Sequence, residues 1–243
     1  MHFKKKYSNS NVTFVNYFKS FSTIRWIFFS ALFFFLTSFG LLINQIVDKL
    51  LQNQFLNTPW TTIDKFTWQS NMLLLIFSIF FVFFPKHQFL KTDSFLISSL
   101  SYIFFTFFGY NFILTILEGG YPKDPFDCFV SVWAHLVCPV VFMVSGILRF
   151  FLEPQTIKLR KFSRTLILGM IYPTIYVIYL STIPFVFNTN DGEVYTVYNI
   201  ATDTKNHPQI AWPAIASIYL IFFPLTFAGF YFSAKKIKIK KSK

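Results

Sequence analysis

Charged side chains are scarce in this chain of 243 residues, and acidic ones are the scarcest. Only 13% of the residues are charged, against about 25% in an ordinary soluble domain. Ten acidic residues face 22 lysines and arginines, which gives a formal net charge of +12. Hydrophobic residues make up 54% of the chain and include 37 phenylalanines. This composition excludes a disordered chain, and a water-soluble globule could not bury so much apolar surface.

Cysteine and histidine are also rare, which excludes the common disulfide and metal-binding frameworks. Cys128 and Cys138 are ten residues apart, about 15 Å along a helix, and this is too far for a disulfide. The four histidines are scattered, and no Cys-x-x-Cys pair is present. We therefore expect neither a metal ion nor a cofactor.

Long apolar runs are what the sequence does contain. A membrane-spanning helix requires about 20 apolar residues, and six stretches reach that length. The predicted spans are 24–47, 66–85, 94–117, 129–152, 162–187 and 209–233. A basic N-terminal segment, 1–23, precedes them, and a basic tail, 234–243, follows. The sequence thus predicts an all-α, polytopic membrane protein with a six-helix transmembrane domain over 24–233.

The basic residues divide unequally between the two sides of the predicted bundle. Six spans place both termini on one side, and that side carries 18 lysines and arginines against four on the other. The positive-inside rule therefore predicts that both termini are cytoplasmic. We expect the basic tail to lie against anionic lipid headgroups of the bilayer, and not to bind nucleic acid.

Polar side chains recur at helical spacing in four of the spans, where they are expected to face the bundle interior. Most of them lie in the half of the bundle away from the termini, which predicts a cavity there. The candidate binding residues are Ser70 and Asn71 in the second span, Tyr110 and Asn111 in the third, Cys138 in the fourth, and Tyr172 and Tyr176 in the fifth. The alternative for each is a hydrogen bond that only holds helices together.

His135 is the one histidine within a predicted span, and an ionisable group inside a membrane indicates function. Pro139, four residues later, has no N–H to donate to the His135 carbonyl. This carbonyl is therefore free for another donor, and we expect a kink in the helix. The alternative is a neutral histidine that packs against a neighbouring helix through a hydrogen bond.

Two segments carry a resemblance to a known family. Phe66–Leu74 (FTWQSNMLL) opens the second span, and Trp133–Pro139 (WAHLVCP) opens the fourth. Together they resemble the androgen-induced-gene family of six-span membrane hydrolases and a related set of bacterial six-span proteins. Tyr172–Tyr176 and the loop 192–198 add to this similarity.

The resemblance implies a multi-pass protein of a bacterial cell membrane that acts on fatty-acyl esters. Family members hydrolyse fatty-acid esters of hydroxy fatty acids, and two residues are essential for this. They match Thr67 at the start of the second span and His135 early in the fourth. The resemblance thus implies that Thr67 and His135 are catalytic.

This assignment is chemically reasonable. A threonine hydroxyl becomes a nucleophile only when a base removes its proton, and histidine is the usual base, so the side chains of Thr67 and His135 must meet. The Asn71 amide, one turn below Thr67, is the first candidate to stabilise an oxyanion, with Ser70 and the Tyr176 hydroxyl behind it. No acidic residue is placed to orient His135, so we expect a tyrosine hydroxyl or a backbone carbonyl to do so.

These residues predict one pocket in the outer half of the bundle. We expect it to be lined by Thr67, Asn71, Tyr110, His135 and Tyr176, with apolar walls that suit an acyl chain.

Two other classes of function stay open: a small-molecule or lipid transporter or binding subunit, and a membrane protein without catalysis. No Asp or Glu lies within a predicted span, which is atypical of coupled transport. The sequence leaves the substrate and the oligomeric state open.

Overall fold

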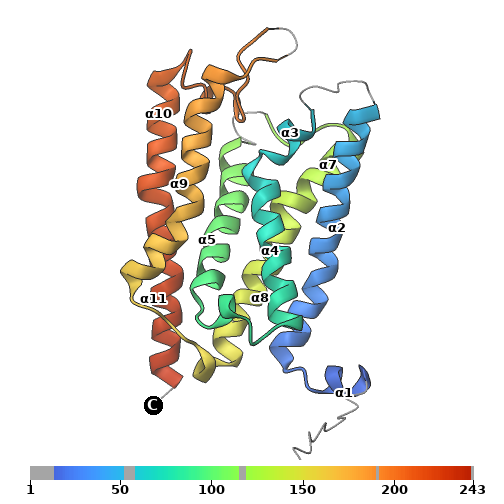
Figure 1. Ribbon diagram of the computed structural model, residues 1–243, viewed down its shortest axis with the longest axis vertical. Helices are drawn as coiled ribbons and strands as arrows, with labels where there is room; N and C mark the ends of the chain where they lie inside the picture. Colours follow the sequence, from blue (N-terminus) through green and yellow to red (C-terminus); the bar gives the residue numbers. More distant parts are fainter. Residues whose placement is uncertain (1–13, 52–57, 115–118, 190–191, 242–243) are drawn as a thin grey trace, which may run out of the picture.

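The computed structural model describes residues 14–51, 58–114, 119–189 and 192–241. Over these residues the protein is all-helical, and six helices are long and apolar enough to cross a membrane. Figure 1 shows them side by side, with their axes running roughly along the length of the molecule. The predicted fold class is therefore confirmed. The first 13 residues of the basic N-terminal segment lie outside the described residues.

Several of the six spanning helices consist of more than one element. After the short α1 (Phe14–Lys19), the first is α2 (Thr23–Leu51); α3 (Thr58–Ile63) then leads into the second, α4 (Phe66–Phe83). The third is α5 (Ser94–Phe108) continued by η2 (Gly109–Leu114), and the fourth comprises α7 (Pro125–Val132), η3 (Trp133–Val137) and α8 (Cys138–Leu152). The fifth is α9 (Phe162–Val186), and the sixth comprises α10 (Pro208–Ser217), η6 (Ile218–Phe222) and α11 (Phe223–Lys241). The last of these elements carries the helix into the basic tail.

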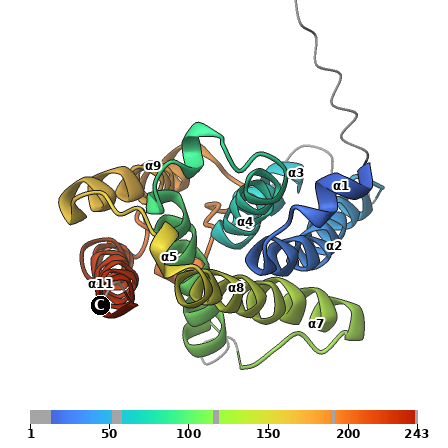
Figure 2. The same ribbon diagram turned by 90° about the horizontal axis from the view of Figure 1, so that it is seen from below.

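Helix α5 lies at the centre of the bundle. It contacts α4, α8, α9 and α11, while α2 packs against α4 and α8. Figure 2 shows α2, α4 and α8 on one side of α5, and α9 and α11 on the other. The core between these helices is largely aromatic, and its fully buried side chains include Phe28, Phe35, Phe77, Phe142 and Phe227.

The two ends of the bundle differ in what they carry. Helix α1 and the end of α11 lie at the same end, here called the termini end, as Figure 1 shows. The opposite end, here called the far end, carries α3, the start of α4, and residues 187–189 and 192–207. An even number of spanning helices accounts for this arrangement. That the termini end is cytoplasmic stays a prediction from the distribution of lysine and arginine.

Three of the spanning helices contain a π-helical turn: η2, η3 and η6. In η3 the N–H of Cys138 donates to the carbonyl of Trp133, five residues back. Pro139 follows directly and has no N–H for the His135 carbonyl. Short π-helical turns are rare and frequently lie at functional sites. Elements η2 and η3 contact each other, and His135 lies in η3.

Candidate functional site

The side chains of Thr67 and His135 form a hydrogen bond. The Thr67 hydroxyl oxygen lies 3.0 Å from Nε2 of His135. Thr67 is the second residue of α4, and His135 is the third residue of η3. Thr67 is 8% exposed, and His135 is partly buried. The expected contact between these two residues is therefore present.

The second ring nitrogen of His135 determines the roles in this hydrogen bond. Nδ1 lies 2.8 Å from the backbone carbonyl oxygen of Ser131, and a carbonyl oxygen can only accept. In the neutral ring, the hydrogen is therefore on Nδ1, and Nε2 is left as the acceptor for the Thr67 hydroxyl. A backbone carbonyl thus orients His135, one of the two expected alternatives.

Tyr110 and Ser131 hold the imidazole ring from its face and its edge. The ring of Tyr110 stacks on that of His135, with 3.6 Å between the ring centroids and 14° between the ring planes. The Ser131 hydroxyl donates to the Tyr110 hydroxyl over 2.5 Å and also lies 3.4 Å from Nδ1 of His135. The orientation of His135 is therefore fixed by contacts with its own helix and with η2.

Two asparagines satisfy the backbone of the π-helical turn. Asn111 Nδ2 donates to the His135 carbonyl over 2.9 Å, so the carbonyl freed by Pro139 has a partner. Asn71 Nδ2 donates to the carbonyls of Ala134, at 3.1 Å, and of Thr67, at 2.9 Å. Both amide hydrogens of Asn71 are thus engaged. In this arrangement the amide satisfies backbone carbonyls, and its donation to an oxyanion stays a prediction.

Ser70 and Cys138 bond to neighbouring helices and to the backbone, and not to the side chains of Thr67 and His135. The Ser70 hydroxyl lies 2.8 Å from that of Thr106 on α5 and donates to the Thr67 carbonyl. The Cys138 thiol donates to the Phe34 carbonyl on α2. For these two residues the contacts are those of helix packing.

Tyr172 and Tyr176, both on α9, bond to α4 and to the residues just before it. The Tyr176 hydroxyl accepts from the N–H of Phe66 and donates to the carbonyl of Asp64, both over 2.9 Å. The Tyr172 hydroxyl donates to Oε1 of Gln69 over 2.8 Å. These bonds hold the first turn of α4, and so position Thr67, without reaching its hydroxyl.

Sequence analysis missed the part played by Asp64. This residue is only 2% exposed, and its Oδ2 accepts from the hydroxyls of Tyr179 and Tyr195, at 2.8 and 2.9 Å. Burial raises the pKa of its carboxyl above the ordinary value, although the two phenols and the charges of Lys65 and Lys49 act in the opposite direction. Asp64 thus joins the start of α4 to α9 and to the segment 192–198. The signal available in the sequence was an isolated acidic residue, Asp64, just before an apolar span, together with tyrosines in a later loop on the same side of the bundle.

A cavity of about 780 Å³ lies along α4, but not where the pocket was expected. Its lining includes Gln69, Met72, Leu73 and Ile76, whereas Thr67, Asn71, Tyr110, His135 and Tyr176 do not line it. The residues of α4 that line it occupy the helix face away from Thr67. This cavity is therefore not the expected pocket, which stays a prediction, and of the candidate binding residues only Tyr172 lines it. Among the described residues, no group of three or more His, Cys, Asp or Glu side chains could hold a metal ion.

The fold defines a class: integral membrane proteins with six spanning helices. The family described as "Protein of unknown function (DUF1600)" matches residues 128–241. The Uncharacterized protein MG452 of Mycoplasma genitalium is 35% identical over 238 residues, which cover 96% of this chain and 88% of that protein. Its homolog in Mycoplasma pneumoniae is 40% identical over 175 residues, 70% of this chain and 69% of the relative.

The chain belongs to one family with these mycoplasma proteins. A further relative, the Uncharacterized protein MG133 of Mycoplasma genitalium, is 26% identical over 245 residues, 87% of this chain and 91% of the relative. No solved structure matches the chain. These matches lend no support to the resemblance to the androgen-induced-gene family, which rests on the residues alone.

Proposed function

We propose that this protein is a lipid-ester hydrolase or acyltransferase of a bacterial cell membrane, with Thr67 as nucleophile and His135 as general base. The observation that carries the proposal is the 3.0 Å contact from the Thr67 hydroxyl to Nε2 of His135. The bond from Nδ1 to the Ser131 carbonyl leaves Nε2 as the acceptor. The nucleophile, the base and the orienting group thus have the order of a Ser-His-Asp triad. The Ser131 carbonyl takes the place of the aspartate that orients the histidine in such a triad.

The reaction proceeds in two steps. The Thr67 oxygen attacks the acyl carbonyl of the ester while its proton passes to Nε2 of His135. The imidazolium then protonates the leaving alcohol, and the acyl group stays on Thr67 as an ester. Water, activated by His135, attacks this ester and releases the fatty acid, so that both residues return to their starting states. An alcohol in place of water makes the second step an acyl transfer.

The start of α4 is the candidate for stabilising the oxyanion. Thr67 lies in the first turn, where helix N–H groups lack acceptors within the helix and the helix dipole is positive. The backbone N–H of a nucleophile is an established oxyanion donor in other hydrolases. Lys65, which precedes the helix, adds a positive charge at the same end.

A lipid substrate suits the surroundings of the pair. Leu136 in η3 and Phe112 in η2 are apolar side chains exposed on the outside of the bundle, 36% and 52% respectively. In a membrane such side chains meet acyl chains, so an ester within the bilayer approaches the pair directly. Because Thr67 is only 8% exposed, the ester carbonyl reaches its hydroxyl when the covering side chains move aside.

The test compares isosteric variants of two buried threonines. The purified full chain is incubated in nanodiscs with a panel of fatty-acyl esters, and the release of fatty acid is measured. Thr67→Val and His135→Gln are each expected to lower turnover by at least about 10³-fold, as loss of a nucleophile or base does in comparable enzymes. Thr106→Val removes a hydroxyl that bonds only to Ser70 in this group and is expected to keep the turnover. A folded Thr67→Val protein with wild-type turnover would refute the proposal.

A further inference from the structure

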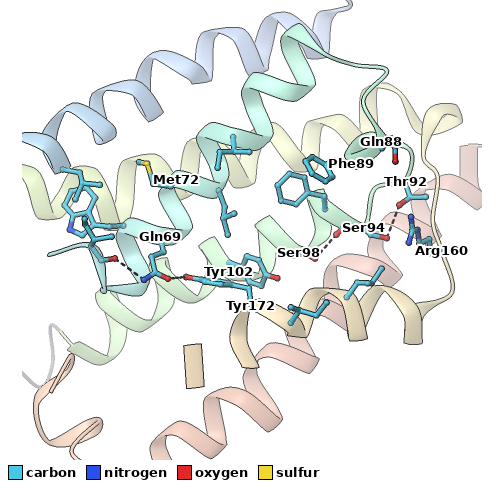
Figure 3. Close-up of a pocket in the computed structure, with 18 residues that line it drawn as sticks. Gln69, Met72, Gln88, Phe89, Thr92, Ser94, Ser98, Tyr102, Arg160 and Tyr172 are labelled. Atoms are coloured by element: carbon cyan, nitrogen blue, oxygen red, sulfur yellow. Dashed lines mark hydrogen bonds between the residues drawn. The ribbon is translucent and has the colours of Figure 1, made fainter. Parts of the chain in front are cut away.

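The cavity along α4 is a long groove with apolar walls. Its middle is lined by Leu73 and Ile76 of α4, Phe95 of α5, and Leu168 and Ile171 of α9. Figure 3 shows these three helices around it, with apolar side chains between two groups of polar ones. A volume of about 780 Å³ is in the range of sites that hold a small organic ligand.

The two ends of the groove differ in charge. At the end of the groove that is further from the termini, the Tyr172 hydroxyl donates to Gln69, and the Gln69 amide donates to the carbonyl of Ile63 over 3.1 Å. These groups satisfy one another and carry no charge. At the termini end, the groove is lined by Gln88, Thr92, Ser94 and Arg160 (Figure 3). The groove is therefore amphipathic along its length, with a cation at one end.

Arg160 has no counter-charge among the residues that the structure describes. Within the described residues, the ion pair that the structure contains joins Arg149 to Asp93, and no carboxylate pairs with the Arg160 guanidinium. Arg160 is partly buried in the segment before α9, and its backbone carbonyl accepts from Tyr231. A partly buried guanidinium with five donors in a fixed fork suits a phosphate, which it binds through two parallel hydrogen bonds.

We propose that the groove binds one acyl chain of an anionic phospholipid, with the phosphate at Arg160 and the chain end near Gln69 and Tyr172. Thr92 and Ser94 supply hydroxyls at the headgroup end. The ligand must have both an apolar chain and an anionic head, because the groove offers a long apolar wall and an unpaired cation. Basic pockets between spanning helices on the cytoplasmic side are typical sites for anionic lipid headgroups.

The length of the groove fits an acyl chain of one leaflet. From Phe162, the first residue of α9, to Tyr172 is ten residues, or about 15 Å of helix. This equals half of the ~30 Å hydrocarbon core. A lipid whose head lies at Arg160 therefore places its chain end beside Gln69 and Tyr172, about level with the middle of the membrane.

This lipid site is separate from the Thr67–His135 pair. Residues of α4 that line the groove lie on the opposite face of the helix from Thr67, and neither residue of the pair lines the cavity. The inference therefore stands whether or not the proposed hydrolysis takes place.

The experiment measures lipid binding to the detergent-purified full chain by native mass spectrometry. Dioleoyl-phosphatidylglycerol is compared with dioleoyl-phosphatidylcholine, which has the same chains and no net charge. Both lipids carry the phosphate, but the ammonium group of phosphatidylcholine is repelled by the Arg160 guanidinium. The wild type is therefore expected to bind phosphatidylglycerol at least about tenfold more tightly. Arg160→Gln is expected to abolish this preference and Arg160→Lys to keep part of it. Arg164→Gln, which removes an exposed charge nearby that does not line the groove, is expected to leave it unchanged.

A second pair of variants tests the apolar wall. Ile171→Trp places a larger side chain in the groove near its Tyr172 end. It is expected to weaken the binding of both lipids at least tenfold, which corresponds to the loss of about two buried methylenes or more. Ile175→Trp, one turn further along α9 and outside the groove, is expected to bind both as the wild type does. Equal binding of the two lipids by the wild type would overturn the proposal. An undiminished preference in a folded Arg160→Gln protein would do the same, as would unchanged binding by Ile171→Trp.

Discussion

Helix α9 approaches α5 and α11 closely at Gly169, because glycine has no side chain there. A Cβ atom there would lie 2.2 and 2.4 Å from two ring carbons of Phe227 on α11, and 2.9 Å from the Ser98 hydroxyl on α5. Phe227 is fully buried, and the Gly169 carbonyl accepts from the Tyr102 hydroxyl over 2.5 Å. We therefore predict that Gly169→Ala destabilises the bundle at this contact.

The size of the effect follows from these distances. An ordinary carbon contact begins near 3.4 Å, so the Phe227 ring or the helix must move by roughly 1 Å. Overpacking of this kind costs about 1–3 kcal/mol, and the better helix propensity of alanine offsets up to about 1 kcal/mol. A net loss of about 1–2 kcal/mol lowers the Tm of a chain of this size by about 2–8 °C.

Two other glycines provide matched controls for thermal unfolding in detergent. A Cβ at Gly229 on α11 would meet nothing within 4 Å, so Gly229→Ala is expected to leave Tm unchanged or to raise it slightly. A Cβ at Gly146 would lie 2.9 Å from the tip of the Leu100 side chain, which can shift, so Gly146→Ala is expected to fall between the two. The reasoning is refuted if Gly169→Ala is as stable as Gly229→Ala.

Three further predictions concern Asp64, the π-helical turn and the topology. Burial raises the pKa of Asp64 in the folded chain above its usual 3.8. The folded chain therefore becomes less stable as pH rises above about 3.8 and through the folded pKa. Asp64→Asn is expected to flatten this part of a plot of Tm against pH, and an unchanged slope would contradict the prediction. Asn111→Ala removes the donor to the His135 carbonyl and is expected to lower the free energy of unfolding by about 1–3 kcal/mol. Denaturation in detergent measures this loss, and an unchanged midpoint would refute the prediction. A cysteine at Asn206 is expected to react with a membrane-impermeant maleimide in intact cells, and one at Lys158 is not; labelling at Lys158 would reverse the orientation.

The fold was predictable because membrane-spanning helices need little more than length and apolarity. The six runs in the sequence correspond to six helices, and the polar residues within them mark interior faces. The meeting of Thr67 and His135 was predictable from the resemblance and from the need of a threonine for a base. Composition and spacing alone do not bring α4 and η3 into contact.

The groove was not predicted, because the polar residues were interpreted as the lining of a pocket elsewhere. Asn71 and Asn111 instead satisfy carbonyls that the π-helical turn frees, and only Pro139 gave a signal of that turn in the sequence. The groove itself is built from apolar faces of three helices, and no sequence pattern reports how such faces align. Arg160 gave no signal either, because it lies in a loop with several other basic residues.

The most direct test of the proposed chemistry is the residue that an active-site reagent modifies. The folded protein is treated with a fluorophosphonate probe, and the attachment site is mapped by mass spectrometry of its peptides. The proposal predicts modification of Thr67, lost in His135→Gln and kept in Thr106→Val. Modification elsewhere, no modification at all, or equal modification of Thr67 in the His135→Gln protein would contradict it.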